Sequence, residues 1–244
     1  MQFAQMIFGS SPVESGVRIA IMGGGGKTSL LHRLGEEFSQ NFPKVIMTAL
    51  TRSAVHPEHP ILFADEIPDL DLTPFFRSQK PLCIMGGREK NKLTGISAVQ
   101  LEQIYPQADV TLFESDGARN LPLKVHLPHD PVVPPFTTQV VILVGADVVD
   151  TSLTDGRVHR PELFREKWQI SPDEPLSVDF IARVVTSTCG YLEKVPDGIS
   201  RIYFVNKGDE HRENAQLLAR AIGTQASAPV FWGSIRRGFW ESVS

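Results

Sequence analysis

The sequence has few cysteines, and those it has are not arranged for metal binding or for disulfide bonds. Its 244 residues include only Cys83 and Cys189, which stand far apart among apolar or small neighbours. This spacing excludes a C-x-x-C metal site and a disulfide framework. We therefore expect two buried free thiols.

The chain also lacks long hydrophobic runs and a strong excess of charge. No run approaches the ~18 apolar residues of a membrane-spanning helix, and the first residues, MQFAQMIFGSSP, lack the basic start and apolar stretch of a signal peptide. The formal net charge of -4 offers no attraction to nucleic acid or to an anionic membrane. These absences predict a cytoplasmic protein that binds neither nucleic acid nor a membrane.

The hydrophobic pattern predicts the fold class. Short runs that are apolar on consecutive positions alternate with segments of helical spacing, as in parallel strands buried on both faces. The expected strands are 17–22, 45–47, 82–85, 110–113, 140–144 and 202–205, and the expected helices are 28–38, 97–105, 161–168, 178–188 and 210–222. The sequence thus predicts one α/β domain over residues 1–244, a three-layer P-loop NTPase-like fold with a mainly parallel sheet.

Proline marks two stretches that break this rhythm. Residues 55–74 and 121–135 each hold several prolines, which can neither donate to a sheet nor continue a helix, so both are expected to be loops. We expect residues 114–138, which include the second stretch, to form a lid or switch over a site.

The strongest functional motif is a glycine run between the first expected strand and the first expected helix. It comprises Gly23, Gly24, Gly25 and Gly26. Glycines tolerate positive φ and let backbone N–H groups approach an anion, and the following helix directs its positive end there. Lys27 would contact the β- and γ-phosphates of a nucleoside triphosphate, Thr28 would hold Mg²⁺, and Ser29 is adjacent.

This motif departs from the strict G-x-x-x-x-G-K-[ST] pattern, because Ile21 stands where the first glycine belongs. We therefore expect a shorter or differently bent phosphate loop. The competing interpretation is an ordinary glycine-rich turn before a surface lysine, against which the strand before and the helix after both argue.

Two acids follow the expected strand 110–113. Glu114 and Asp116 would point into the crevice at the carboxyl ends of the strands, where ligands of α/β sheets gather. Either carboxylate would hold Mg²⁺ or orient an attacking water, and spacing alone does not decide between them. The alternative is a solvated turn, for which Asp-Gly is a common pair.

A base-reading motif follows the expected strand 202–205. Asn206, Lys207 and Asp209 form N-K-x-D, and a carboxylate in the plane of guanine accepts from both N1–H and the N2 amino group, whereas adenine presents an acceptor at N1. The Lys207 stem would pack on the base, and Asn206 would bond the base or tie its own loop to the glycine loop. GTP is expected over ATP; the alternative is the start of a surface helix.

Several cationic residues are weaker candidates. Arg119 and Lys124 would supply positive charge to a phosphoryl transition state, beside Lys27, Glu114 and Asp116 as the catalytic set. Arg88, Lys90 and Lys92 form a basic loop that either clamps an anion or is simply solvated.

Histidines give a further set of candidates. His126, His129 and Asp130 are close in sequence and could together bind a metal ion, but the intervening prolines favour surface positions for all three. His159 and Arg160 precede an expected helix and would face the crevice.

Together these segments resemble one family, the selenium-dependent hydroxylase accessory proteins of the YqeC type. The shared segments are GGGGKTSLL, MGGREKNKLTGIS, LFESDGARNLPLKVHLPHDPVVP, VHRPELF and FVNKGD, in family order over nearly the whole chain. Family members usually read E-A-D-G where Ser115 stands here. The resemblance implies a P-loop protein associated with maturation of selenium-dependent molybdenum hydroxylases, with such a hydroxylase or its cofactor-maturation proteins as partner.

Three functions remain open from the sequence. The first is a Mg²⁺-dependent GTPase or NTPase that drives a maturation step. The second is transfer of a phosphoryl or nucleotidyl group to a small acceptor held by Arg88, Lys92, Lys124 or His159. The third is a nucleotide-gated adaptor with negligible turnover.

Overall fold

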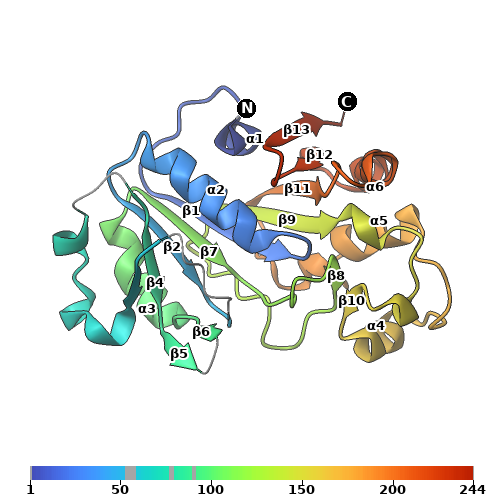
Figure 1. Cartoon of the computed structure of the whole chain (residues 1–244), viewed down its shortest axis with the longest axis horizontal. Helices are drawn as coiled ribbons and strands as arrows, with labels where there is room; N and C mark the ends of the chain where they lie inside the picture. Colours follow the sequence, from blue (N-terminus) through green and yellow to red (C-terminus); the bar gives the residue numbers. More distant parts are fainter. Residues whose placement is uncertain (1, 53–58, 77–79, 90–91, 244) are drawn as a thin grey trace.

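The protein folds around one large sheet with helices on both faces (Figure 1). The computed structural model describes residues 2–52, 59–76, 80–89 and 92–243, with Lys92 described by its backbone alone. In space the strands run β13-β12-β11-β9-β1-β7-β2-β4-β3, and each neighbouring pair is parallel except β12 with β13. The predicted three-layer α/β fold with a mainly parallel sheet is confirmed.

The large sheet comprises β1 (Val17–Gly23), β2 (Val45–Ala49), β3 (Ile61–Phe63), β4 (Leu82–Met85), β7 (Val110–Glu114), β9 (Gln139–Gly145), β11 (Ser200–Asn206), β12 (Val230–Ser234) and β13 (Phe239–Ser242). Two small sheets pair β5 (Gly87–Glu89) with β6 (Lys92–Thr94), and β8 (Leu123–Lys124) with β10 (Val158–His159). The helices are α1 (Phe3–Phe8), α2 (Lys27–Ser39), α3 (Ala98–Ile104), α4 (Pro161–Trp168), α5 (Val178–Thr186) and α6 (Arg212–Gln225).

Each face of the sheet has its own hydrophobic core. Along β1, Ile19 and Ile21 pack with α1 and α2, whereas Ala20 and Met22 pack on the opposite side with residues of α3, α5 and α6. Because successive side chains of a strand point to opposite faces, a strand covered on both sides must be apolar throughout. This explains why consecutive apolar residues located the central strands.

Strand register places the glycine run and Glu114 at the carboxyl ends of the central strands. Ile21 of β1 pairs with Glu114 of β7, and Gly23 pairs with Leu143 of β9. The central strands are parallel, so their carboxyl ends open on the same side, where α/β proteins bind ligands.

The chain ends also lie close to each other (Figure 1). The indole Nε1 of Trp240, in β13, donates to the carbonyl oxygen of Gln2 at 3.3 Å. The C-terminal hairpin therefore continues the sheet beside the N-terminal helix α1. Among the described residues, no helix combines the length and apolar character that crossing a membrane requires.

Several sequence expectations were wrong in detail. The described part of 55–74 contains strand β3 at the sheet edge, while residues 55–58 lie outside the described residues. The stretch 121–135 contains the short strand β8, which pairs with β10. Cys83 is a buried free thiol as expected, but Cys189 is exposed.

Candidate functional site

The glycine loop is short. Strand β1 runs through Gly23 and helix α2 begins at Lys27, so only three residues connect them. Gly25 and Gly26 have φ of 81° and 130°, in the region that L side chains rarely adopt, which is why glycine is needed there. The expectation of a loop shorter than the strict motif thus agrees with the backbone.

The loop presents a row of unused hydrogen-bond donors. The N–H groups of Gly24 and Gly25 donate to the carbonyl oxygens of Leu143 and Leu121, both at 3.0 Å. In contrast, the N–H groups of residues 26–29 have no acceptor within the described part of the chain, and the first intrahelical bond, from Leu30 to Gly26, closes at 3.0 Å. Consecutive free donors at a helix start are an arrangement that suits an anion.

Neighbouring backbone packs closely against the glycine loop. A Cβ on Gly24 would lie 2.5 Å from the carbonyl oxygen of Leu121, and one on Gly25 would lie 2.6 Å from the backbone nitrogen of Gly145. Such distances leave no room for a side chain. The loop is therefore fixed by contacts with the segment after β7 and with the end of β9 rather than free to collapse.

Asp116 is fully buried and bonds the glycine loop. Its Oδ2 accepts from the backbone N–H of Gly23 at 3.0 Å, and its Oδ1 lies 3.2 Å from the Nζ of Lys27. Lys27 also donates to the carbonyl oxygen of Gly23 at 2.7 Å. Burial by itself would raise the pKa of Asp116, but the ammonium groups of Lys27 and Lys124 outweigh it and hold this pKa well below its usual range. Asp116 is thus an ionised, fully buried partner of the loop lysine.

Thr28 and Glu114 bring two oxygen ligands together. The Thr28 hydroxyl donates to Oε1 of Glu114 at 2.6 Å, and both residues line the same large cavity. Hydroxyl and carboxylate oxygens are the ligands that Mg²⁺ prefers. Of the two acids that the sequence left open, Glu114 therefore lies with Thr28, whereas Asp116 lies with Lys27.

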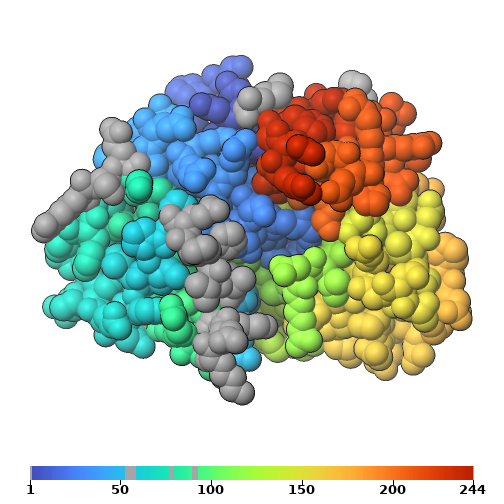
Figure 2. Space-filling view, in the orientation of Figure 1, coloured from blue at the N-terminus to red at the C-terminus, as the bar shows by residue number. Residues whose placement is uncertain are grey.

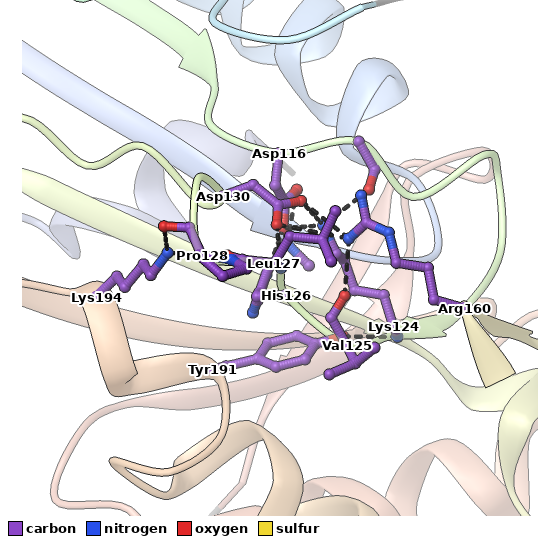
Figure 3. Close-up of polar contacts among 12 residues, drawn as sticks. Asp116, Lys124, Val125, His126, Leu127, Pro128, Asp130, Arg160, Tyr191 and Lys194 are labelled. Atoms are coloured by element: carbon purple, nitrogen blue, oxygen red, sulfur yellow. Dashed lines mark hydrogen bonds and ion pairs between the residues drawn. The ribbon is translucent and has the colours of Figure 1, made fainter. Parts of the chain in front are cut away.

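Asp116 belongs to a buried network of charged and polar side chains (Figure 3). The Nζ of Lys124, which is fully buried, lies 2.7 Å from Asp130 and 3.4 Å from Asp116, and it donates to the carbonyl oxygen of Gly117 at 2.8 Å. The His126 ring contacts Oδ2 of Asp116 at 2.6 Å. Burial lowers the pKa of His126 more than the Asp116 contact raises it, so the ring is neutral near pH 7.

The network extends to two further segments of the chain (Figure 3). Arg160 donates from NH1 to the carbonyl oxygen of Val125 at 2.9 Å and lies 3.2 Å from Oδ2 of Asp130. The hydroxyl of Tyr191 accepts from the backbone N–H of Lys124 at 3.1 Å. Lys194 donates to the carbonyl oxygen of Leu127 at 2.8 Å. The segment after β7 is thus tied to β10 and to residues 191–194.

The N-K-x-D motif lines a smaller cavity of about 290 Å³ beside the glycine loop. Asn206 donates from Nδ2 to the carbonyl oxygen of Gly25 at 2.6 Å and accepts at Oδ1 from the N–H of Ile235 at 3.0 Å. It therefore clips the glycine loop to the ends of β11 and β12, which is one of the two roles that the motif left open. Lys207 lies 2.6 Å from Oδ2 of Asp147, which follows β9, so its stem is held along the cavity.

A larger cavity of about 1100 Å³ opens on the other side of the loop. Both cavities are lined by Gly25, Gly26, Ser29 and Asn120, so the loop forms the wall between them. Arg119, His159 and Arg160 also line the larger cavity. In Figure 2 the surfaces of the N-terminal part (blue), the segment after β7 (light green) and the C-terminal part (orange to red) adjoin one another on this face.

Comparison with known proteins places this site in a family. A model of the YqeC protein family matches residues 19–162, more than half of the chain. The chain belongs to the YqeC family. It is also 28% identical over 196 residues to "Uncharacterized protein YqeC" of Escherichia coli (strain K12), an overlap of 78% of this chain and 75% of that protein. The YqeC match contains every residue that lines the larger cavity, whereas Asn206, Lys207 and Asp209 lie beyond it.

Some residues that the sequence suggested do not reach a cavity in this YqeC family member. Lys124 is buried between Asp116 and Asp130 and lines neither cavity, and Arg88 lies on β5 outside both. Lys90 and the side chain of Lys92 lie outside the described residues. The expectation that His126 and Asp130 are surface residues was wrong, because the side chain of each is only 4% exposed.

Sequence reasoning missed the partners that fix these residues. Asp147 holds Lys207, and Tyr191 and Lys194 hold the segment after β7. Their only sequence signal is polarity close to a strand end or a short turn, which many surface residues share. Only the tertiary fold brings them to the site.

Proposed function

We propose that this protein binds a Mg²⁺-nucleoside triphosphate at the glycine loop, with GTP preferred to ATP, and hydrolyses it. The observation that carries the proposal is the row of N–H groups at residues 26–29 that have no acceptor among the described residues, combined with the Lys27 ammonium and the Thr28–Glu114 pair. Backbone donors, a helix N-terminus and a lysine at one point are what a polyphosphate needs.

The residues fit Mg²⁺ as the accompanying cation. Thr28 and Glu114 would hold it, since their oxygens already lie 2.6 Å apart. Within the described ranges no cluster of three or more His, Cys, Asp or Glu side chains forms a cage of its own, which suits Mg²⁺, a cation usually held by one or two carboxylates together with substrate phosphates. Mg²⁺ supplies neutralisation of the charge on the phosphate oxygens.

The protein's own side chains would bind the phosphates and recognise the base. Lys27 would turn its ammonium from the Gly23 carbonyl toward the phosphates, while the carboxylate of Asp116 holds it close to the loop. Asp209 would accept from N1–H and N2 of guanine in the smaller cavity, and the anchored stem of Lys207 would pack against the base. In this proposal the base lies on one side of the loop and the phosphate end on the other.

The test is a calorimetric titration with GTP, ATP and CTP in the presence of Mg²⁺, together with an assay of phosphate release. GTP should bind at least tenfold more tightly than ATP or CTP, because a mismatched base leaves the carboxylate unpaired. Lys27→Ala should abolish binding, whereas Lys44→Ala, a change at an exposed lysine outside both cavities, should not alter it. Micromolar affinity in Lys27→Ala would overturn the phosphate-loop assignment, and tight binding without phosphate release would favour a nucleotide-gated adaptor.

The biological role of turnover is proposed from the family resemblance. Hydrolysis would support maturation of a selenium-dependent molybdenum hydroxylase, with that enzyme or its maturation proteins as partner. A nucleotide-dependent complex between the two purified proteins, seen with wild type and lost in Lys27→Ala, is the expected result.

A further inference from the structure

The larger cavity has more room than the phosphates of a nucleotide would use. Small-molecule sites measure about 300 to 1,000 Å³, and this cavity of about 1100 Å³ lies beside a second one on the other side of the glycine loop. If the base lies by Asp209, the phosphates end at Lys27 and Thr28. The part of the larger cavity formed by the segments around 119 and 159–160 is then unoccupied by nucleotide.

This remaining part is lined by cationic and neutral donors whose hydrogen-bonding capacity is unused. The exposed guanidinium of Arg119 makes no hydrogen bond or ion pair within the described residues, and Arg119 lines the larger cavity. Arg160 uses NH1 on Val125 and Asp130, and its other nitrogens have no acceptor in the same part of the chain. A guanidinium held in place with free donors matches carboxylate and phosphate groups.

His159 adds a neutral group to the cationic lining of this space. It is 9% exposed and lines the larger cavity, yet its ring has no hydrogen-bond partner among the residues that the structure describes. Burial, followed by the charges of Arg160, Lys124 and Arg119, lowers the pKa of His159 to about 4, so the ring is neutral near pH 7. A neutral imidazole donates at one nitrogen and accepts at the other, so the His159 ring can contact either the oxygen of an anion or a hydroxyl group of a bound molecule.

We propose that the larger cavity binds a second small molecule that carries an oxyanion, a carboxylate or a phosphate, which Arg119 and Arg160 recognise and His159 contacts. The site rests on the proposed nucleotide function for its biological sense, since the bound molecule would lie beside the triphosphate end of the loop. It also revises the sequence expectation for a small acceptor: Arg119 and Arg160 take the place of Arg88 and Lys124.

The experiment first saturates the glycine loop with a nucleotide and then titrates small anions into the remaining part of the larger cavity. Protein saturated with Mg²⁺ and guanosine 5′-(β,γ-imido)triphosphate is titrated with inorganic phosphate and, separately, with acetate, which distinguishes the two kinds of oxyanion. Binding is measured by calorimetry and by the ring nitrogen shifts of His159 in labelled protein. We expect saturable binding of at least one anion, with a shift of the His159 signals.

Variants locate the binding. Arg119→Ala should weaken anion binding at least tenfold, and Arg220→Ala, which removes an exposed arginine of α6 outside both cavities, should leave it unchanged. Nucleotide affinity and thermal midpoint, measured on the same samples, report whether each variant is folded. Equal anion binding in wild type and Arg119→Ala, or no movement of the His159 signals, overturns the proposal.

Two outcomes separate this site from the nucleotide function. If phosphate binds through Arg119 only when nucleotide is absent, the cavity merely receives the γ-phosphate and the second-ligand proposal fails while the nucleotide function stands. If wild type binds no nucleotide, the proposed function fails, and the titration is repeated in Lys27→Ala protein, where the loop lacks its cation. Arg119-dependent binding there still supports the anion site, and its absence overturns that site too.

Discussion

The carboxylate of Asp209 has no close hydrogen-bond or ion-pair partner among the described residues. Within the described residues its one charged partner is Arg237, whose Nε lies 3.8 Å away, at the limit of an ion pair. Asp209 is nonetheless largely shielded, with 13% of its side chain exposed in the wall of the smaller cavity. A shielded carboxylate without a close donor is suited to a ligand that brings two donors, as guanine does.

The first prediction concerns base choice. In Asp209→Asn the amide still accepts one hydrogen bond but also donates, which suits the 2-carbonyl of xanthine in place of the 2-amino group of guanine. GTP affinity should fall at least tenfold and XTP affinity should rise, as measured by competition against a fluorescent nucleotide. The thermal midpoint should hardly change, because a loose, partly exposed ion pair contributes little. An unchanged order of GTP over XTP would remove the base-reading role.

At the residue scale, motif residues could be named from sequence but their contacts could not. The run from Gly23 to Thr28 was found because its chemistry is local, and the structure brings it to the strand ends as expected. His126 was misjudged because proline-rich sequence suggests a surface loop, whereas its side chain points inward to Asp116. The direction in which a loop side chain points depends on packing with segments that are distant in sequence.

At the element scale, the glycine loop depends on two neighbouring strand ends. Asn206 at the end of β11 bonds both the Gly25 carbonyl and the N–H of Ile235 just after β12, and it is only 7% exposed. Because a Cβ at Gly26 would lie 2.5 Å from Nδ2 of Asn206, the two are in close contact as well. The loop therefore takes its shape from a strand that lies two positions away in the sheet.

The second prediction removes this clip. Asn206→Ala leaves a carbonyl and an N–H without their partner, which should lower the free energy of unfolding by about 2 to 4 kcal/mol. GTP affinity should fall about tenfold, since the N–H groups of the loop are no longer held in place. Urea unfolding and amide exchange of residues 24–26 provide the measurements. Asn41→Ala, at an exposed asparagine without side-chain hydrogen bonds in the described chain, is the matched control; equal exchange at the loop in both variants would contradict the clip.

Element prediction succeeded where a segment carries one clear pattern. Residues 82–85 and 161–168 were expected with the bounds that β4 and α4 have, because an apolar run and a proline-led helix start are local signals. Strands β12 and β13 were missed: Gly233 and Ser234 interrupt the apolar pattern, and β13 is half exposed at the edge. The order of strands in the sheet could not be derived, since it depends on pairing between distant segments.

At the scale of the whole molecule, the charge network joins parts of the chain that are far apart in sequence. Asp130 is 3% exposed and faces Lys124 from β8 and Arg160 after β10, while Asp116, His126 and His159 lie around the same group. Burial alone would raise the pKa of Asp130, but the hydrogen bond and charge of Lys124, the Leu127 N–H and Arg160 together lower it below its ordinary value. The ionised carboxylate therefore stabilises the folded state.

The third prediction follows from the sign of that shift. A carboxyl whose pKa is lower in the folded protein than in the unfolded chain, where it is about 3.9, contributes stability above that value, and the contribution is lost as pH falls toward the folded pKa. Asp130→Asn should therefore reduce the free energy of unfolding by about 3 kcal/mol at neutral pH, as expected when one partner of a buried ion pair is removed. The difference from wild type should stay constant from pH 7 to 5 and narrow below about pH 4.

Urea unfolding at pH 7, 5, 4 and 3 measures this difference directly, because the other carboxylates titrate in both proteins. Asp197→Asn, at an exposed aspartate with no side-chain contact in the described chain, should change stability by less than about 0.5 kcal/mol at each pH. A difference for Asp130→Asn that persists unchanged to pH 3 would mean that the residue acts through packing rather than through its charge. The network would then hold the segment after β7 by shape, and its charges would serve the phosphate loop alone.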